Sequence, residues 1–172
     1  MINPHSSRIS SRSFYRLIGY NVNAGRALVL LFSVALLIGF FIYLRMVWGN
    51  KHALAGTLIL ILLPTYLGLS GSVMIGLPAI ALAMLALLAQ TAWHQYRKYI
   101  WLVLSAIVLC LSVFTKLFTA ILVPLFIVGF LVDEYHRVAS WRQALCPVLI
   151  WIIIFAGLTT LLGLVFIGHE NI

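Results

Sequence analysis

Two isolated cations are the residues of this 172-residue chain best suited to bind a charged ligand. Arg26 stands at the start of one long apolar run, and Lys116 stands between two others, flanked by Phe114 and Phe118. Neither has an acidic residue nearby in the sequence, and guanidinium and ammonium groups suit phosphate oxygens. Both are therefore candidates to bind the phosphate of a membrane lipid. The alternative for Lys116 is that it only extends its ammonium to the membrane surface.

Other chemistry has little support in the sequence. The acids are Asp133, Glu134 and Glu170, and no His/Cys/Asp/Glu cluster has the spacing of a metal site. Cys110 and Cys146 fall in or beside apolar runs, so we interpret both as small apolar residues. No glycine-rich phosphate loop and no Ser/His/Asp set is present. We therefore expect no metal, no nucleotide and no other cofactor.

The elements that must position the two cations are membrane helices. Hydrophobic residues make up 64% of the chain and charged residues 8%, and the mean hydropathy of +1.14 is far above that of a soluble domain. A helix needs about 20 residues to cross the roughly 30 Å hydrocarbon core. Six apolar stretches approach this length: Ala27–Leu44, Ala53–Leu69, Ser72–Ala92, Tyr99–Thr115, Leu117–Val132 and Cys146–Ile167. We predict an all-α, polytopic transmembrane helical bundle of about six spans. Five spans remain an alternative because the fourth and fifth stretches are short.

The formal net charge of +8 would suggest a nucleic-acid partner in a soluble protein. Here the basic residues lie in joints between apolar runs, where they orient helices and meet anionic lipid head groups, so we assign no nucleic-acid partner. The joints reached after the first, third and fifth stretches define side B, and the opposite joints define side A. Side B carries six basic residues: Arg45, Lys51, Arg97, Lys98, Arg137 and Arg142. Side B is therefore predicted to be cytoplasmic, with Asp133–Arg142 as its longest joint.

Three parts follow from this pattern: a basic leader at 1–26, a transmembrane domain at 27–168 and a short tail at 169–172. The leader is an exception to the charge rule, because it brings Arg8, Arg12, Arg16 and Arg26 to side A. An inverted topology, or a further span upstream of the leader, would explain this. Residues 13–20 mix apolar and basic side chains as in an amphipathic surface helix, and a flexible basic tail is the alternative.

Several motifs carry a family resemblance when taken in order. Ala24-Gly25-Arg26-Ala27-Leu28 opens the first span, Leu62-Leu63-Pro64-Thr65-Tyr66 and the Ser70–Ala79 run follow, and Leu111–Leu117 then precedes an apolar run with Pro124. From about Gly25 to Asp133 the chain resembles the polyprenyl-phosphate-dependent glycosyltransferases, which include the protein O-mannosyltransferases and the lipid A aminoarabinose transferase. The resemblance implies a multi-pass enzyme of the bacterial plasma (inner) membrane that transfers a sugar from a polyprenyl-phosphate carrier. Arg26 and Lys116 would then bind the phosphate of the carrier.

The chain also departs from that family. The catalytic acid of the first extracytoplasmic loop has no counterpart, and the third span reads Ile75-Gly76-Leu77-Pro78 where some relatives carry an acid. The resemblance therefore implies a fragment or truncated relative that transfers little or no sugar alone, since the acceptor lacks a base. The alternative is a small polytopic transporter or scaffold that shares only Leu/Ala composition. Acids within a span or an inverted repeat would favour transport, and the sequence indicates neither. The expected partner is membrane lipid, with a polyprenyl-phosphate sugar as the specific candidate, and protein partners are left open.

Overall fold

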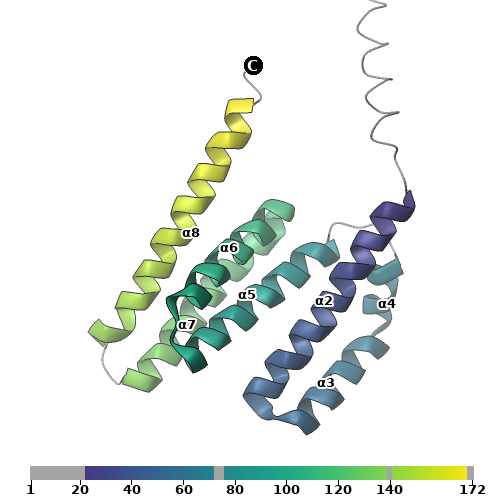
Figure 1. Ribbon diagram of the computed structural model, residues 1–172, viewed down its shortest axis with the longest axis horizontal. Helices are drawn as coiled ribbons and strands as arrows, with labels where there is room; N and C mark the ends of the chain where they lie inside the picture. Colours follow the sequence, from purple (N-terminus) through teal and green to yellow (C-terminus); the bar gives the residue numbers. More distant parts are fainter. Residues whose placement is uncertain (1–21, 72–75, 139–140, 170–172) are drawn as a thin grey trace, which may run out of the picture.

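The computed structural model describes residues 22–71, 76–138 and 141–169 of the chain. Its elements are the helices α2 (Val22–Trp48), α3 (Asn50–Leu62), α4 (Pro64–Gly71), α5 (Gly76–Tyr96), α6 (Tyr99–Thr115), the 3₁₀ helix η1 (Leu117–Ile121), α7 (Leu122–Val138) and α8 (Trp141–His169). No strand occurs in these three ranges, so the predicted all-α class is confirmed. Figure 1 shows the helices side by side, with α5 and α6 near the middle; α2 and α5 run in the same direction, and α6 runs back in the opposite direction.

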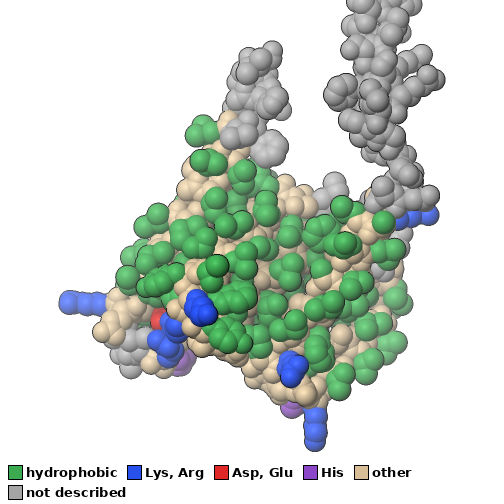
Figure 2. All heavy atoms as spheres, viewed as in Figure 1, with side chains coloured by type: hydrophobic (Ala, Val, Ile, Leu, Met, Phe, Trp, Pro, Cys, Tyr) green, Lys and Arg blue, Asp and Glu red, His purple; other side chains and the backbone are tan. Residues whose placement is uncertain are grey.

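The chain is an integral membrane protein by the length and composition of its helices. Four of those described are long and apolar enough to cross a bilayer, at Gly25–Trp48, Gly76–Tyr96, Leu117–Arg137 and Trp141–Leu164. Figure 2 shows hydrophobic side chains over the middle of the visible face and most of its Lys and Arg along the lower edge. Exposed leucines such as Leu31, Leu62 and Leu164, each 65–74% accessible, fit a lipid-facing surface and not a watery one.

Two of the six predicted stretches form shorter helices. The prediction Tyr99–Thr115 coincides with α6, which has 17 residues. The stretch Ala53–Leu69 is interrupted instead: Leu63 has extended backbone (φ −64°, ψ 121°), and Pro64 begins α4. Proline disfavours helical backbone in the residue before it and donates no backbone hydrogen bond, which explains the break. Six full-length spans are therefore not established by helix length.

The fifth and sixth stretches differ from the prediction at side B. We expected a joint over Asp133–Arg142, but α7 continues through Asp133 and Glu134 to Val138, and α8 already begins at Trp141. The reason is that Glu134 is buried against α5 and paired with cations there, so these polar residues lie in a packed helix. Helix α2 likewise begins at Val22, within the predicted leader 1–26. Residues 1–21 of that leader and 170–172 of the predicted tail lie outside the described residues.

Small residues join α5 to α6. Ala86 and Ala106 are fully buried, and the Ser105 hydroxyl donates to the Ala86 carbonyl at 3.0 Å. About two helical turns after Ser105 on α6, the Ser112 hydroxyl donates to the Ala79 carbonyl at 2.8 Å. In lipid, apolar burial alone does not drive helices together, so close backbone approach and such hydrogen bonds stabilise the pair. These contacts fix the position of α5, which also packs against α2.

The interruption at Pro64 is also stabilised by a polar contact. Tyr66, in α4, is buried and its hydroxyl donates to the Ser33 carbonyl of α2 at 3.1 Å. The same hydroxyl contacts the Ser33 side chain, which is itself buried. A hydroxyl pair inside an apolar bundle needs such partners, because an unpaired polar group there is costly. Helix α4 is therefore held against α2 in spite of its short length.

A cysteine at Gln95 tests the predicted sidedness. Gln95 is exposed near the end of α5, beside Arg97 and Lys98, so Gln95→Cys in a background of Cys110→Ala and Cys146→Ala should resist an impermeant thiol reagent in intact cells. Ser72→Cys, in the chain before α5, is the matched control and should label. Labelling at position 95 together with protection at position 72 would mean that the topology is inverted.

Candidate functional site

The two cations singled out from the sequence lie at the same end of the bundle, on different helices. Arg26 is exposed in the first turns of α2, and Lys116 is exposed at the junction of α6 and η1. Helix α5 separates them, because α2 packs on one part of α5 and η1 contacts another. The structure therefore brings the two residues to a common end, side A, without placing them in one cluster.

Lys116 lies where the chain leaves one helix and enters the next. Its backbone is extended (φ −152°, ψ 114°), and its carbonyl accepts hydrogen bonds from the backbone N–H and the hydroxyl of Thr119 at 2.9 and 2.8 Å. Its side chain folds over α5: a methyl group added at Gly76 would lie 3.4 Å from Lys116 Nζ. The glycine therefore leaves room for an ammonium group at the first turn of α5.

Lys116 lines a cavity of about 320 Å³, here called the Lys116 cavity. The rest of its described lining comes from α5, η1 and the start of α7: Gly76, Ile80, Phe118, Thr119, Ile121 and Leu122. Among the described residues that line this cavity, Lys116 is the only charged one. One cation at the edge of an apolar cavity suits an amphiphile with an anionic head and a hydrocarbon body.

Two further cavities follow along α5. The central cavity, about 330 Å³, shares Ile80 and Leu122 with the Lys116 cavity and has an almost wholly apolar lining. The Gln90 cavity, about 510 Å³, shares Leu87, Leu122 and Phe126 with the central cavity. The three cavities are therefore neighbours along one face of α5. The central and Gln90 cavities lie between α2 and α7, and the Lys116 cavity lies against η1 and the start of α7.

The residues of α5 that line this series recur with helical spacing. They are Gly76, Ile80, Ala83, Met84, Leu87, Gln90, Thr91 and His94, separated mostly by three or four positions. Such spacing places them on one stripe of the helix. The stripe changes from apolar to polar toward side B, so the series has a cationic end at Lys116 and a different polar end at Gln90 and His94.

The polar end of the Gln90 cavity contains hydrogen-bonding atoms without partners. Gln90 is buried and its Nε2 donates to the Phe126 carbonyl at 3.3 Å, but its Oε1 is buried with no partner in the described part of the chain. The Thr91 hydroxyl donates to the Leu87 carbonyl at 2.9 Å. His94 Nε2 lies 3.7 Å from Asp133 Oδ2 and makes no hydrogen bond among the described residues.

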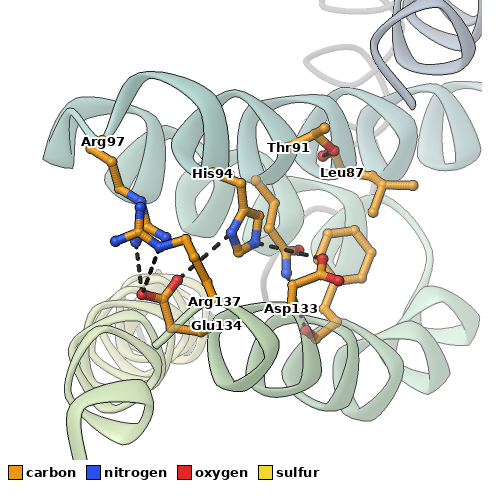
Figure 3. Close-up of polar contacts among 9 residues, drawn as sticks. Leu87, Thr91, His94, Arg97, Asp133, Glu134 and Arg137 are labelled. Carbon is orange, nitrogen blue, oxygen red and sulfur yellow. Dashed lines mark hydrogen bonds and ion pairs between the residues drawn. The ribbon is translucent and has the colours of Figure 1, made fainter. Parts of the chain in front are cut away.

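The buried carboxylate of Glu134 lies beside His94, next to the polar end of the Gln90 cavity. Glu134, whose side chain is 4% exposed, has Oε1 at 2.8 Å from Arg97 Nη1, and Arg137 Nε lies 3.9 Å from the same oxygen. His94 Nδ1 is 3.7 Å from the other carboxylate oxygen. Figure 3 shows His94 between Glu134 and Asp133, with Arg97 on the far side of Glu134. The group links the ends of α5 and α7.

Arg97 also ends helix α5. Its φ of +55° is left-handed, a conformation that costs a non-glycine residue about 1 kcal/mol or more. Its backbone N–H donates to the Trp93 carbonyl at 2.9 Å, and its guanidinium lies 5.2 Å from the centre of the Trp93 ring. The ion pair with Glu134 offsets the backbone strain, so the end of α5 and the charge network depend on one residue.

Sequence reasoning missed this second polar end. It placed Asp133 and Glu134 on a loop and treated the Trp93–Lys98 joint only as a basic aromatic anchor. The available signal was charge complementarity: both adjacent acids and a His/Arg/Lys joint were assigned to side B. Within the described ranges no group of three or more His, Cys, Asp or Glu residues could hold a metal ion.

Comparisons with protein-family models, with curated proteins and with solved structures return no match for this chain. A fold of packed helices does not by itself indicate an activity. The features that bear on function are therefore the two ends of the cavity series and the residues that line them.

Proposed function

We propose that the protein is a polyprenyl-phosphate-dependent, glycosyltransferase-like protein of a bacterial plasma (inner) membrane, and that it holds the phosphate of the lipid carrier at Lys116. In this proposal the chain crosses the membrane six times, with α3 plus α4 and α6 as the shorter crossings. The alternating direction of successive helices in Figure 1 supports this count. The order of sequence motifs from Gly25 to Asp133 supports the family assignment.

The observation that carries the proposal is the position of Lys116 at the edge of an apolar cavity. An ammonium group attracts phosphate oxygens, and the apolar walls beside it accept the first hydrocarbon units of the carrier. Lys116 Nζ lies over the first turn of α5, 3.4 Å from the place that a Cβ at Gly76 would take, whereas a lysine that only reached the membrane surface would extend outward. Arg26, exposed at the same end, is the second cation of the proposed site.

The described acids cannot serve as a base at this site. Asp133 and Glu134 lie near the end of α7, and a helix rises about 1.5 Å per residue, so they lie about 25 Å from Lys116 along the bundle. General base catalysis needs hydrogen-bond reach to the reacting group. The proposal therefore concerns binding of the carrier phosphate, and it assigns no catalytic role to either acid.

Lys116→Met tests the proposed phosphate contact. The change keeps an unbranched apolar side chain and removes the ammonium, so binding of a polyprenyl monophosphate should weaken about tenfold, as for one lost hydrogen bond to a charged group. The measurement is lipid binding by the full chain in phosphatidylcholine nanodiscs. Lys98→Met, the same substitution on the exposed lysine at side B, should bind like wild type.

The Arg26→Gln, Lys116→Met double variant extends the test to both cations. We expect it to bind the phosphate lipid more weakly than either single variant. Equal binding by the double variant and wild type would leave surface extension of Lys116 as the better account, and the proposed function would lose its structural support.

One observation favours transport as a second candidate function. Glu134 is buried in α7, which forms one of the four membrane-length helices, and acids in such positions often mark ion or proton pathways. Sequence reasoning had found no acid within a span. However, Arg97 holds Glu134 at 2.8 Å, and a transporting carboxylate must exchange partners. The pair is therefore better explained as a structural link between α5 and α7.

A further inference from the structure

We infer that the Gln90 cavity binds a primary ammonium group carried on a small apolar body. The cavity lies at side B, at the opposite end of α5 from Lys116, so the inference is independent of the proposed phosphate site. Its volume of about 510 Å³ is within the range of small-molecule sites. Tyr43 and Val47 of α2 form one wall, and Leu125 and Phe126 of α7 form another.

The polar atoms at this cavity are mainly acceptors. Gln90 donates one of its two amide N–H groups to the Phe126 carbonyl, and its buried Oε1 has no donor in the described structure. Thr91 uses its hydroxyl proton on the Leu87 carbonyl and keeps lone pairs free. Asp133 adds a carboxylate. A ligand must therefore supply donors to satisfy these atoms.

His94 can provide a further acceptor for a ligand that carries N–H donors. His94 Nδ1 lies 3.7 Å from Glu134 Oε2, and Nε2 lies 3.7 Å from Asp133 Oδ2, so the proton of a neutral ring can sit on either nitrogen. When the proton is on Nδ1, Nε2 is an acceptor. Nε2 is buried and has no hydrogen bond among the described residues. An ammonium group carries three N–H donors, so it can satisfy Gln90 Oε1 and Asp133 with one donor left for Nε2.

Charge excludes the main competing ligands. The described residues that line the cavity include no lysine or arginine, because Arg97 and Arg137 pair with Glu134 behind it. An anion would meet the Asp133 carboxylate without a compensating cation. A divalent metal ion would find one carboxylate and no group of three ligands. A monovalent organic cation with N–H donors fits the charge and the donor balance.

The apolar walls define the rest of the ligand. Leu87, Leu122 and Phe126 continue into the central cavity, so a hydrocarbon body attached to the ammonium can extend along α5. Two sources have this chemistry: the ethanolamine head group of a membrane phospholipid, and a free alkylamine from the aqueous phase. Both place an ammonium at the level of the Asp133 carboxylate, and the experiment separates them.

The test measures binding of n-octylamine by calorimetry to the full chain in phosphatidylcholine nanodiscs, with empty nanodiscs subtracted. We expect saturable binding of octylamine and at least about tenfold weaker binding of two matched probes. Octanol lacks the charge, and octyltrimethylammonium keeps the charge but has no N–H donor. Nanodiscs that contain phosphatidylethanolamine should weaken octylamine binding if the head group is the natural ligand. Unchanged binding there assigns the site to free amines.

Two variants connect the binding to the cavity. Asp133→Asn removes the charge from a side chain that is 64% exposed, so the fold is retained, and octylamine binding should fall about tenfold. Gln90→Met removes the unpaired acceptor at similar length and should also weaken binding. Lys51→Met and Arg142→Gln, which each remove one charge from an exposed, described residue that does not line the cavity, should bind octylamine like wild type. Wild-type affinity in Asp133→Asn, or octanol binding as tight as octylamine binding, would overturn the inference.

Discussion

Glu134→Gln is expected to lower the free energy of unfolding by about 3 kcal/mol, the largest effect we predict for a single substitution. The Glu134 side chain is 4% exposed and lies 2.8 Å from Arg97 Nη1. Loss of its charge leaves the guanidinium partly buried without its carboxylate, and Arg97 also holds the left-handed end of α5. Removal of one partner from a buried ion pair costs more than removal of both.

The neighbouring acid provides the matched control. Asp133→Asn changes an exposed carboxylate 3.7 Å from His94 and should cost less than about 1 kcal/mol. The Arg97→Met, Glu134→Met double variant should be more stable than the sum of its single variants predicts. The measurement is unfolding by sodium dodecyl sulfate in micelles, followed by reaction of buried Cys110 with a thiol dye in a Cys146→Ser background. Equal losses for Glu134→Gln and Asp133→Asn would contradict the described ion pair.

Ala86→Leu is the second large effect, and we expect a loss of about 2 to 3 kcal/mol. Ala86 is fully buried between α5 and α6, and its carbonyl accepts the Ser105 hydroxyl at 3.0 Å. Leucine is no less compatible with lipid than alanine, so the loss comes from forcing the two backbones apart. In membranes such close approach supplies much of the association energy.

Ala55→Leu on α3 is the control for this substitution. Ala55 is exposed, so the larger side chain enters lipid and should leave the unfolding free energy within about 0.5 kcal/mol of wild type. The same dodecyl sulfate titration compares the two variants. If Ala86→Leu is no less stable than Ala55→Leu, then α5 and α6 do not pack through the small residues described here.

Both predictions concern α5, because one face of this helix packs against α6 and another face lines the cavities. Ala79 and Ala86 are among the residues that hold it against α6, while Gly76, Ile80 and Leu87 line the cavity series. A displacement of α5 at either face changes the other.

The sequence by itself determined the class of the protein and the place of its helices in broad outline. In lipid every backbone polar group needs a partner within the helix, so a long apolar run without charges has few alternatives to a helix. For this reason α6 begins and ends where the hydropathy pattern predicted, at Tyr99 and Thr115. Lys116 was also identified from the sequence, because a cation between two apolar runs is costly unless it lies at a helix end.

The tertiary structure decided which polar groups meet. Arg97 and Glu134 are far apart in the chain, and neither hydropathy nor residue spacing indicates that the ends of α5 and α7 pack together. The same packing turned an expected loop at Asp133 into helix, and it placed Lys116 Nζ against Gly76. Hydropathy describes the transfer of each side chain from water to lipid, one residue at a time. Pairing of buried charges and the shape of cavities depend on contacts between helices, which only the packed bundle defines.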